Sequence, residues 1–329
     1  MGPAREAFLA ADVVAARADN PSAFLALNRG NLQYTEEGRD GLVVYRRSGR
    51  YLMQFGGPFA AEQDYAALLK SFLAFAAAQR RRVVAVQLQR RDAEQYAEHG
   101  FTVNQIGASY AVHLPDFTLR GGKFMRLRNK ISRAFRAGLK VSECEPGQSL
   151  EPLDLIDRDW LRSKGRHVRP LQFLVGEHDG PVQARRRVFL ARLGDEPIGY
   201  ISYAPVHGSR PGWLHDLSRR RAQAPPGVME AVNRTAIETF TAERAQWLHF
   251  GFTPFVGLDP ALEMPTAHRG VGRVVSWLSE HGERLYPSAS QLAYKEKWGP
   301  HVVLPEYLAF HGRPRAGAVW RLARVTNAI

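Results

Sequence analysis

Midway along the 329-residue chain, residues 122–138 read GKFMRLRNKISRAFRAG. Four apolar residues recur in this segment at steps of three and four, which places them on one face of a helix: Phe124, Leu127, Ile131 and Phe135. The remaining surface of that helix is cationic, and Gly138 is suited to end it. The segment therefore predicts a basic connecting helix, with one α/β half before it and another after it.

Strands and helices alternate in both halves. Before the basic helix we expect strands at 41–46, 51–55, 83–88 and 101–114 and helices at 61–80 and 91–99, with Gly56-Gly57-Pro58 ending the second strand. After it we expect helices at 150–163, 227–244 and 266–284, strands at 188–193, 197–205, 212–217 and 247–250, and an arginine- and proline-rich loop at 218–226. This order predicts a mixed α/β (α+β) fold with a lobe at 1–120, the connecting helix at 121–145 and a second lobe at 146–329.

The charge balance favours an anionic partner. Lys and Arg number 45 against 32 Asp and Glu, a formal net charge of +13, which attracts polyanions such as RNA or anionic lipid head groups. A GC-rich genome would explain the preference for Arg over Lys, but not the excess of cations over acids. Six cations of the basic helix are candidate contacts to tRNA or to a membrane: Lys123, Arg126, Arg128, Lys130, Arg133 and Arg136. An ordinary solvated helix face is the alternative.

Other classes of protein fit the sequence less well. No apolar stretch approaches the roughly 20 residues that span a bilayer, and we find no export signal, so we expect a soluble cytoplasmic chain, peripheral at most to the inner face of the membrane. The single cysteine, Cys144, excludes internal disulfide bonds, and its acidic neighbours disfavour a thiolate nucleophile. Despite eleven histidines there is no HExxH pattern and no cysteine-rich zinc spacing, so we expect no metal.

Five runs of sequence stand in the order seen in one family. They are GKFMRLRNKISRA at 122–134, DLSRR at 216–220, PGVME at 226–230, YKEKWGP at 294–300 and PEYL at 305–308. Together, over residues 24–311, they resemble the C-terminal synthase domain of the phosphatidylglycerol aminoacyltransferases, the lysyl- and alanyl-phosphatidylglycerol synthases. The resemblance implies two tandem lobes of the GNAT acyltransferase type, with the acceptor end of aminoacyl-tRNA and the lipid reaching a shared tunnel from opposite sides. No cofactor is expected, because the ester of aminoacyl-tRNA is already activated.

The catalytic candidates lie in the second run. Asp216 stands at the end of a predicted strand, with His215 before it and Arg219 three residues on, so an acid, a candidate base and a cation are expected at one loop mouth. By resemblance, Asp216 and Arg219 match the acid and the arginine of the family's Asp-Leu-x-Arg stretch, where both are needed. The alternative is a structural ion pair between Asp216 and the arginines at 219–221.

Six further residues are candidates for binding substrate: Arg220, Gly227, Phe252, Lys295, Lys297 and Tyr307. Gly227 opens a predicted helix whose unpaired amides favour an oxyanion or phosphate, and the arginines before it replace the glycine-rich cradle of acetyl-CoA users. Lys295 and Lys297 are expected on a strand or loop, where alternate residues point the same way, towards phosphate; a solvated edge is the alternative. Phe252 lies in the stretch that lines the cleft of the related family, and Tyr307 lies in the last run.

These features predict an aminoacyltransferase that moves an amino acid from aminoacyl-tRNA to a phospholipid head group such as phosphatidylglycerol. The lipid synthases usually carry an N-terminal multi-pass flippase that is not in this sequence. The sequence is then either a domain excised from a longer membrane protein or a stand-alone relative, for which a soluble metabolite or peptide is the alternative acceptor. A non-catalytic module that binds RNA or lipid is the third hypothesis. The identity of the transferred amino acid is not encoded in any motif.

Overall fold

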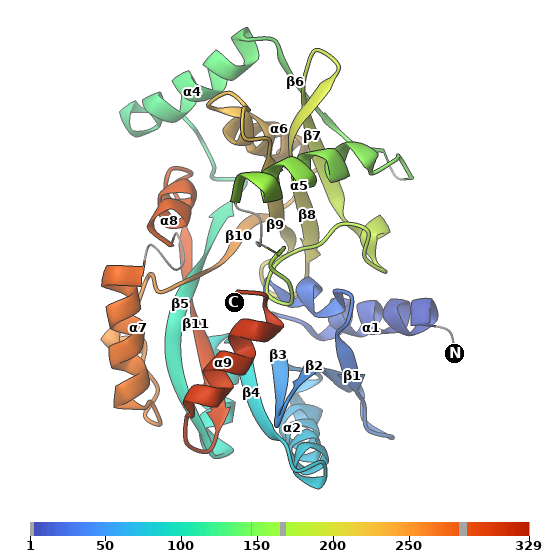
Figure 1. Cartoon of the computed structure of the whole chain (residues 1–329), viewed down its shortest axis with the longest axis vertical. Coiled ribbons are helices and arrows are strands. Elements are labelled where there is room, and N and C mark those ends of the chain that lie inside the picture. Colours follow the sequence, from blue (N-terminus) through green and yellow to red (C-terminus); the bar gives the residue numbers. More distant parts are fainter. Residues whose placement is uncertain (1–2, 146, 165–168, 283–287, 329) are drawn as a thin grey trace.

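The computed structural model describes residues 3–145, 147–164, 169–282 and 288–328. Across these residues one continuous sheet of eleven strands runs in the order β1-β2-β3-β4-β11-β5-β10-β9-β8-β7-β6, from the lower to the upper half of the molecule in Figure 1. The strands are β1 Leu32–Tyr34, β2 Gly41–Ser48, β3 Tyr51–Ala60, β4 Arg82–Leu88, β5 Phe101–His113, β6 Leu139–Glu143, β7 Arg187–Leu193, β8 Glu196–Val206, β9 Gly212–Arg220, β10 Trp247–Pro254 and β11 Val302–His311.

The last strand of the chain lies in the middle of the sheet. β11 pairs with β4 on one side and with β5 on the other, and β5 pairs in turn with β10. The two halves of the sequence therefore share one sheet, and the C-terminal segment completes the first half. The mixed α/β class is confirmed, whereas the domain borders expected near 120 and 145 stay predictions.

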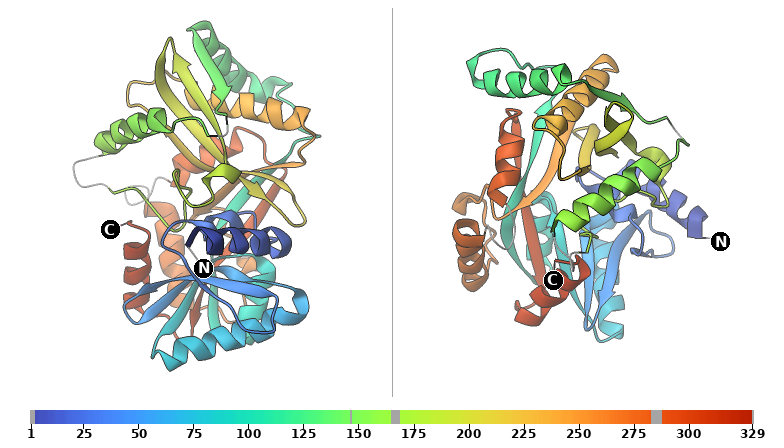
Figure 2. Two further views of the ribbon diagram at one scale, coloured as in Figure 1. Left: turned by 90° about the vertical axis from the view of Figure 1, so that its right-hand side faces the viewer. Right: turned by 45° about the horizontal axis from the view of Figure 1, so that its top comes forward.

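Helices pack against both faces of the sheet (Figure 2). They are α1 Pro3–Arg17, α2 Glu62–Ala78, α3 Arg90–Glu98, α4 Met125–Arg136, α5 Glu151–Lys164, α6 Val228–Ala242, α7 Arg269–His281, α8 Ser288–Glu296 and α9 Ala316–Val325. Alternation along β3 shows how the faces divide, because Leu52 packs in the cluster that contains α2 and Met53 in the cluster that contains α1. In the second half, α6 and α5 belong to separate core clusters.

The predicted basic helix is α4. Leu127 and Ile131 are buried as predicted, but Phe135 is 40% exposed and Ala134 takes its place in the core. The reason is the close approach of α6, since a Cβ at Gly227 would lie 2.5 Å from the Lys130 carbonyl and 3.3 Å from the Ala134 methyl. The helix therefore turns the small Ala134 towards α6, and not the large Phe135 that the apolar spacing predicted to be buried.

Tertiary pairing changes several predicted boundaries. β3 does not end at Gly56-Gly57-Pro58 but continues to Ala60, because a register shift against β2 absorbs the positive φ of Gly56. β9 continues to Arg220, since its last three residues pair with β8, so the predicted loop begins later than expected. The segment that carries Lys295 is the helix α8 and not a strand or loop, which corrects the expectation that Lys295 and Lys297 point the same way. The first helix, α1, was not anticipated.

Candidate functional site

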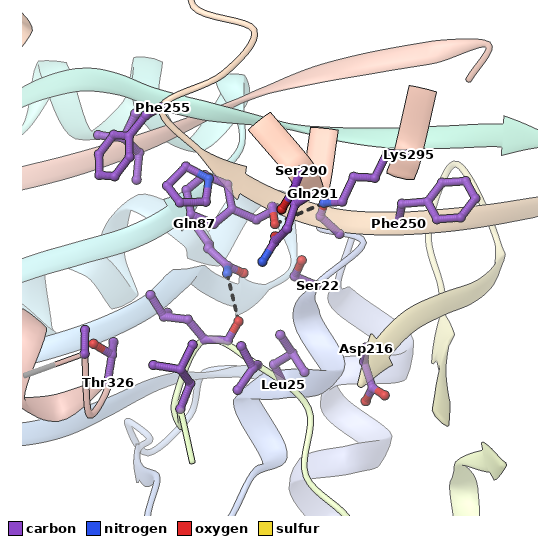
Figure 3. Close-up of a pocket in the computed structure, with 18 of the residues that line it drawn as sticks. Ser22, Leu25, Gln87, Asp216, Phe250, Phe255, Ser290, Gln291, Lys295 and Thr326 are labelled. Carbon is purple, nitrogen blue, oxygen red and sulfur yellow. Dashed lines mark hydrogen bonds between the residues drawn. The ribbon is translucent and has the colours of Figure 1, made fainter. Parts of the chain in front are cut away.

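A cavity of about 1490 Å³ opens among α6, β9, β10 and the helices α7, α8 and α9. It exceeds the roughly 300–1,000 Å³ of common small-ligand pockets. Polar groups gather where α8 meets β9 and α6: Lys130, His215, Glu230 and Lys295. Apolar side chains from both halves line the remainder, among them Ile106, Val271, Leu278 and Phe310. Leu25, Phe250 and Phe255 also line it (Figure 3). The cavity can therefore hold a long ligand with a polar head and an apolar body.

Lys295 is the central polar group of this cavity. Its side chain is buried, and its Nζ donates hydrogen bonds to the carbonyls of Gly251, at 2.7 Å, and Phe252, at 3.1 Å. Burial lowers the pKa of Lys295 to about 7, and the nearby Glu306 opposes part of that shift. An amine that is partly neutral near pH 7 can accept a proton, which an ordinary lysine cannot do.

Glu306 stands behind Lys295 on β11. Burial raises the pKa of Glu306 to about 8, although the hydroxyl of Ser109 donates a hydrogen bond to its carboxyl group. Glu306 and Lys295 each favour the charged form of the other, but burial outweighs that attraction for both groups. This arrangement keeps the Lys295 pKa low.

His215 is poorly suited to the role of base that the sequence suggested. Its ring lies among those of Tyr203, Phe250 and Tyr294, with centroids 5.6 to 6.1 Å away. Burial and the nearby Lys295 ammonium lower the pKa of His215 to about 3. The imidazole is therefore neutral at physiological pH and gains a proton only with difficulty.

Asp216 does not pair with the arginines that follow it. Its side chain is wholly buried, and the Nε of Arg186, equally buried, donates to its Oδ2 at 3.0 Å. The same guanidinium donates to Asn28 and lies over the ring of Phe24. Burial raises the pKa of Asp216, and Arg186 opposes that shift. In Figure 3 the Asp216 carboxylate is turned away from Lys295.

Arg219 points elsewhere again. Its guanidinium lies 3.7 Å from the ring centroid of Trp160 on α5, and its Nε is 3.8 Å from the carboxylate of Asp157. In β9, Leu217 pairs with Ser202 and His215 pairs with Tyr203, so Asp216 is the extra residue of a β-bulge. The bulge turns the Asp216 side chain away from the direction that regular alternation along the strand would give it. Asp216, His215 and Arg219 all border the cavity, as expected of one site, but their side chains contact different partners: Arg186, a cluster of aromatic rings and Trp160.

Glu230 links the basic helix to the cavity. Its Oε1 accepts hydrogen bonds from Lys130 of α4 and from Lys297, both at 2.8 Å. Burial would raise the pKa of Glu230, but the two lysines outweigh that effect and the pKa lies below its usual value. Lys297 is therefore occupied by a carboxylate and lies apart from Lys295.

Of the other residues predicted to bind substrate, three line the cavity and Tyr307 does not. Arg220, Gly227 and Phe252 line the cavity, as expected of residues that contact substrate. Gly227 has φ +99° and precedes the first turn of α6. Tyr307 is fully buried on β11, donates its hydroxyl hydrogen to the Leu262 carbonyl and is not part of the cavity wall. Its placement does not support a substrate contact.

The cations of α4 are mostly available to a partner. Lys123, Arg126, Arg133 and Arg136 are exposed and form no ion pair with a described residue. Arg128 instead donates to the carbonyls of Leu119 and Gly121. Three exposed charges on α4 and Lys123 in the turn before it thus face solvent, while Lys130 is tied to the cavity.

Sequence reasoning missed the residues that hold the candidates in place, namely Trp160, Arg186, Glu230 and Glu306. Glu230 and Glu306 lie inside the runs at 226–230 and 305–308, so the signal was present but unread. Arg186 and Trp160 lie far from Asp216 and Arg219 in sequence, and no local pattern pairs them. Among the described residues, no group of three or more potential ligands could hold a metal ion. Within the same residues no helix has the length and apolar character needed to cross a membrane.

Comparison with known proteins identifies relatives. The model of the family described as phosphatidylglycerol lysyltransferase, C-terminal, matches residues 11–310. The phosphatidylglycerol lysyltransferase of Bacillus subtilis (strain 168) is 25% identical over 284 residues, which cover 84% of this chain and 32% of that protein. The lysylphosphatidylglycerol biosynthesis bifunctional protein LysX of Mycolicibacterium vanbaalenii is 23% identical over 212 residues, 61% of this chain and 19% of that protein. The chain spans about a third or less of the length of these relatives.

Solved structures share the fold. The C-terminal domain assigned to a lysylphosphatidylglycerol synthetase of Agrobacterium fabrum superimposes with a TM-score of 0.80 at 23% identity, covering 100% of this chain and 99% of that chain. The L-PGS structure from Bacillus licheniformis gives a TM-score of 0.77 at 20% identity, covering 97% and 96%. The match over residues 11–310 includes all five runs quoted above.

Proposed function

The chain belongs to the family of C-terminal domains of phosphatidylglycerol lysyltransferases, and from this membership we propose that it is an aminoacyltransferase. The proposed donor is aminoacyl-tRNA, and the proposed acceptor is the head group of a phospholipid such as phosphatidylglycerol. One observation carries the proposal: Lys295, a buried amine with a lowered pKa, lies at the polar end of a large cavity whose remaining wall is apolar.

Lys295 is proposed to move the proton. A neutral amine that donates both of its hydrogens, to Gly251 and Phe252, keeps its lone pair for a third partner. That lone pair takes the proton of the acceptor hydroxyl while the oxygen attacks the aminoacyl carbonyl. A new ester C–O bond forms, the ester bond to the tRNA ribose breaks, and the proton passes to the departing ribose oxygen.

The same residue can stabilise the intermediate. Once protonated, Lys295 carries positive charge in a buried site at the moment when the carbonyl oxygen becomes negative. The low exposure of the site favours this effect, since water screens charges inside the cavity poorly. No redox group or activated cosubstrate enters the step, because the aminoacyl ester supplies the driving force.

The remaining candidates receive positioning or binding roles. Arg219 borders the cavity with its guanidinium against Trp160, where it is suited to hold a phosphate of the donor. Asp216 would act through its ion pair with Arg186, which fixes the bulge in β9. The exposed cations of α4 would contact the tRNA backbone. The phospholipid acceptor would bring the protein to the inner face of the membrane.

The proposal is tested by incubating the protein with tRNA charged with radiolabelled lysine or alanine and with vesicles that contain phosphatidylglycerol. We expect label in the extracted lipid, a rate that rises with pH as Lys295 loses its proton near pH 7, and a loss of roughly 10²- to 10⁴-fold in Lys295→Met. Lys140→Met, which changes an exposed lysine on β6, is the matched control. Label that appears in a soluble acceptor would identify the alternative substrate class, and intact tRNA ester with every acceptor would refute the activity.

A further inference from the structure

The cavity has an apolar rim that faces solvent on α7 and α9. Four large apolar side chains are more than half exposed there: Val274 at 57%, Trp277 at 55%, Val319 at 52% and Trp320 at 56%. Val274, Val319 and Trp320 also line the cavity wall. These four residues are called the α7/α9 rim. Two exposed tryptophans beside a cavity mouth are costly in water unless something covers them.

Exposed arginines predominate around the rim, where Glu280 is the exposed acid of α7. Arg269 and Arg273 on α7 and Arg315 and Arg324 at α9 are exposed, and none forms an ion pair with a described residue. Residues 311–329 contain no acid at all. Tryptophans flanked by unpaired arginines on an amphipathic helix match the interface of an anionic lipid leaflet, where the rings enter the head-group layer and the arginines meet phosphates.

The rim differs from the other basic surface of the molecule. α4 also carries exposed apolar residues, Met125 and Phe135, but it has no tryptophan, and neither residue borders the cavity. α4 lies at the upper end of Figure 1, whereas α9 lies in its lower half and α7 beside β5. α9 also begins after residue 310, where the match to the family model ends.

From these observations we propose that the α7/α9 rim is the surface with which the protein docks on an anionic phospholipid leaflet, so that a lipid head group passes from the leaflet directly into the cavity. The choice of phosphatidylglycerol as the probe rests on the proposed function. The docking itself rests on the exposed tryptophans, the unpaired arginines and the continuity of the rim with the cavity wall.

The test measures binding of the full chain to sedimented vesicles, without tRNA. Vesicles of phosphatidylglycerol and phosphatidylcholine in equal parts are compared with vesicles of phosphatidylcholine alone. We expect binding to the anionic vesicles only, a loss of roughly tenfold or more in Trp277→Ser/Trp320→Ser, and a loss of about fivefold in Arg273→Gln. Brominated lipid should quench more of the tryptophan fluorescence of the wild-type protein than of Trp277→Phe/Trp320→Phe, which keeps the other four tryptophans.

The matched control is Met125→Ser/Phe135→Ser, which removes two exposed apolar side chains from α4. The docking proposal would be overturned if Trp277→Ser/Trp320→Ser bound anionic vesicles as well as the wild-type protein does. It would also be overturned if Met125→Ser/Phe135→Ser lost as much vesicle binding as the tryptophan variant. Because tRNA is absent, failure of aminoacyl transfer with intact, tryptophan-dependent docking would count against the proposed function alone. Aminoacyl transfer to vesicles that survives in a tryptophan variant with unchanged binding would count against the docking alone.

Discussion

At the scale of single residues, the ion pair between Asp216 and Arg186 makes the sharpest stability prediction. Both side chains are wholly buried, so Asp216→Asn leaves a guanidinium without its counter-charge among Asn28 and Phe24. Breaking one partner of a buried pair costs about 3–5 kcal/mol, whereas an exposed pair is worth about 0–1 kcal/mol. We expect Asp216→Asn and Arg186→Gln each to lower the free energy of unfolding in urea by the larger amount.

The double variant separates the pair from a general loss of packing. Asp216→Asn/Arg186→Gln removes both charges, so it should be less destabilised than the sum of the two single changes. A small effect of Asp216→Asn on unfolding would show that the pair is weak in solution. The rate of aminoacyl transfer is then compared per folded molecule. If folded Asp216→Asn transferred the aminoacyl group at a near-normal rate, Asp216 would have no role in the reaction.

At the scale of secondary-structure elements, α4 predicts a salt dependence. Lys123, just before α4, and Arg126, Arg133 and Arg136 on it are exposed and form no ion pair with a described residue, so each can displace a counterion from tRNA. Affinity for tRNA should fall steeply with salt, and Arg133→Gln should reduce the slope of log K against log salt by about 0.7–0.9. Arg47→Gln, at an exposed position on β2, is the control. An unchanged slope in Arg133→Gln would mean that this arginine does not contact the tRNA backbone.

The elements also show what sequence can and cannot predict. The periodic patterns located most of the strands and helices, including the basic helix, because apolar spacing is a local property. They failed at Gly56-Gly57-Pro58, at residues 218–220 and at Lys295, where a partner strand or a packed helix decides the conformation. The sequence predicted only part of the site, again because tertiary contacts decide the rest. A motif pointed to Lys295, but the lowered pKa of Lys295 depends on its burial against β10 and β11. The pairing of Asp216 with Arg186 joins segments that no local pattern connects.

At the scale of the whole molecule, the position of β11 unites the site. The strand that follows α8 returns to the centre of the sheet, between β4 and β5, and brings Glu306 behind Lys295. The first half also contributes to the cavity wall through Leu25, Gln87 and Ile106. The cavity is therefore built by both halves together, so the second half alone would lack part of its apolar wall.

The separation of α4 from the α7/α9 rim makes the last prediction, which concerns two partners at once. α4 lies at one end of the molecule and α9 in the other half, so tRNA and a lipid leaflet can occupy the protein together (Figure 1). Free tRNA is repelled by anionic vesicles, and a cationic protein that binds both can overcome that repulsion. We expect labelled tRNA to sediment with phosphatidylglycerol vesicles only when the protein is present, and to remain in solution with Trp277→Ser/Trp320→Ser. Competition, in which added vesicles release tRNA from the wild-type protein, would place both partners on one surface and refute the two-sided arrangement.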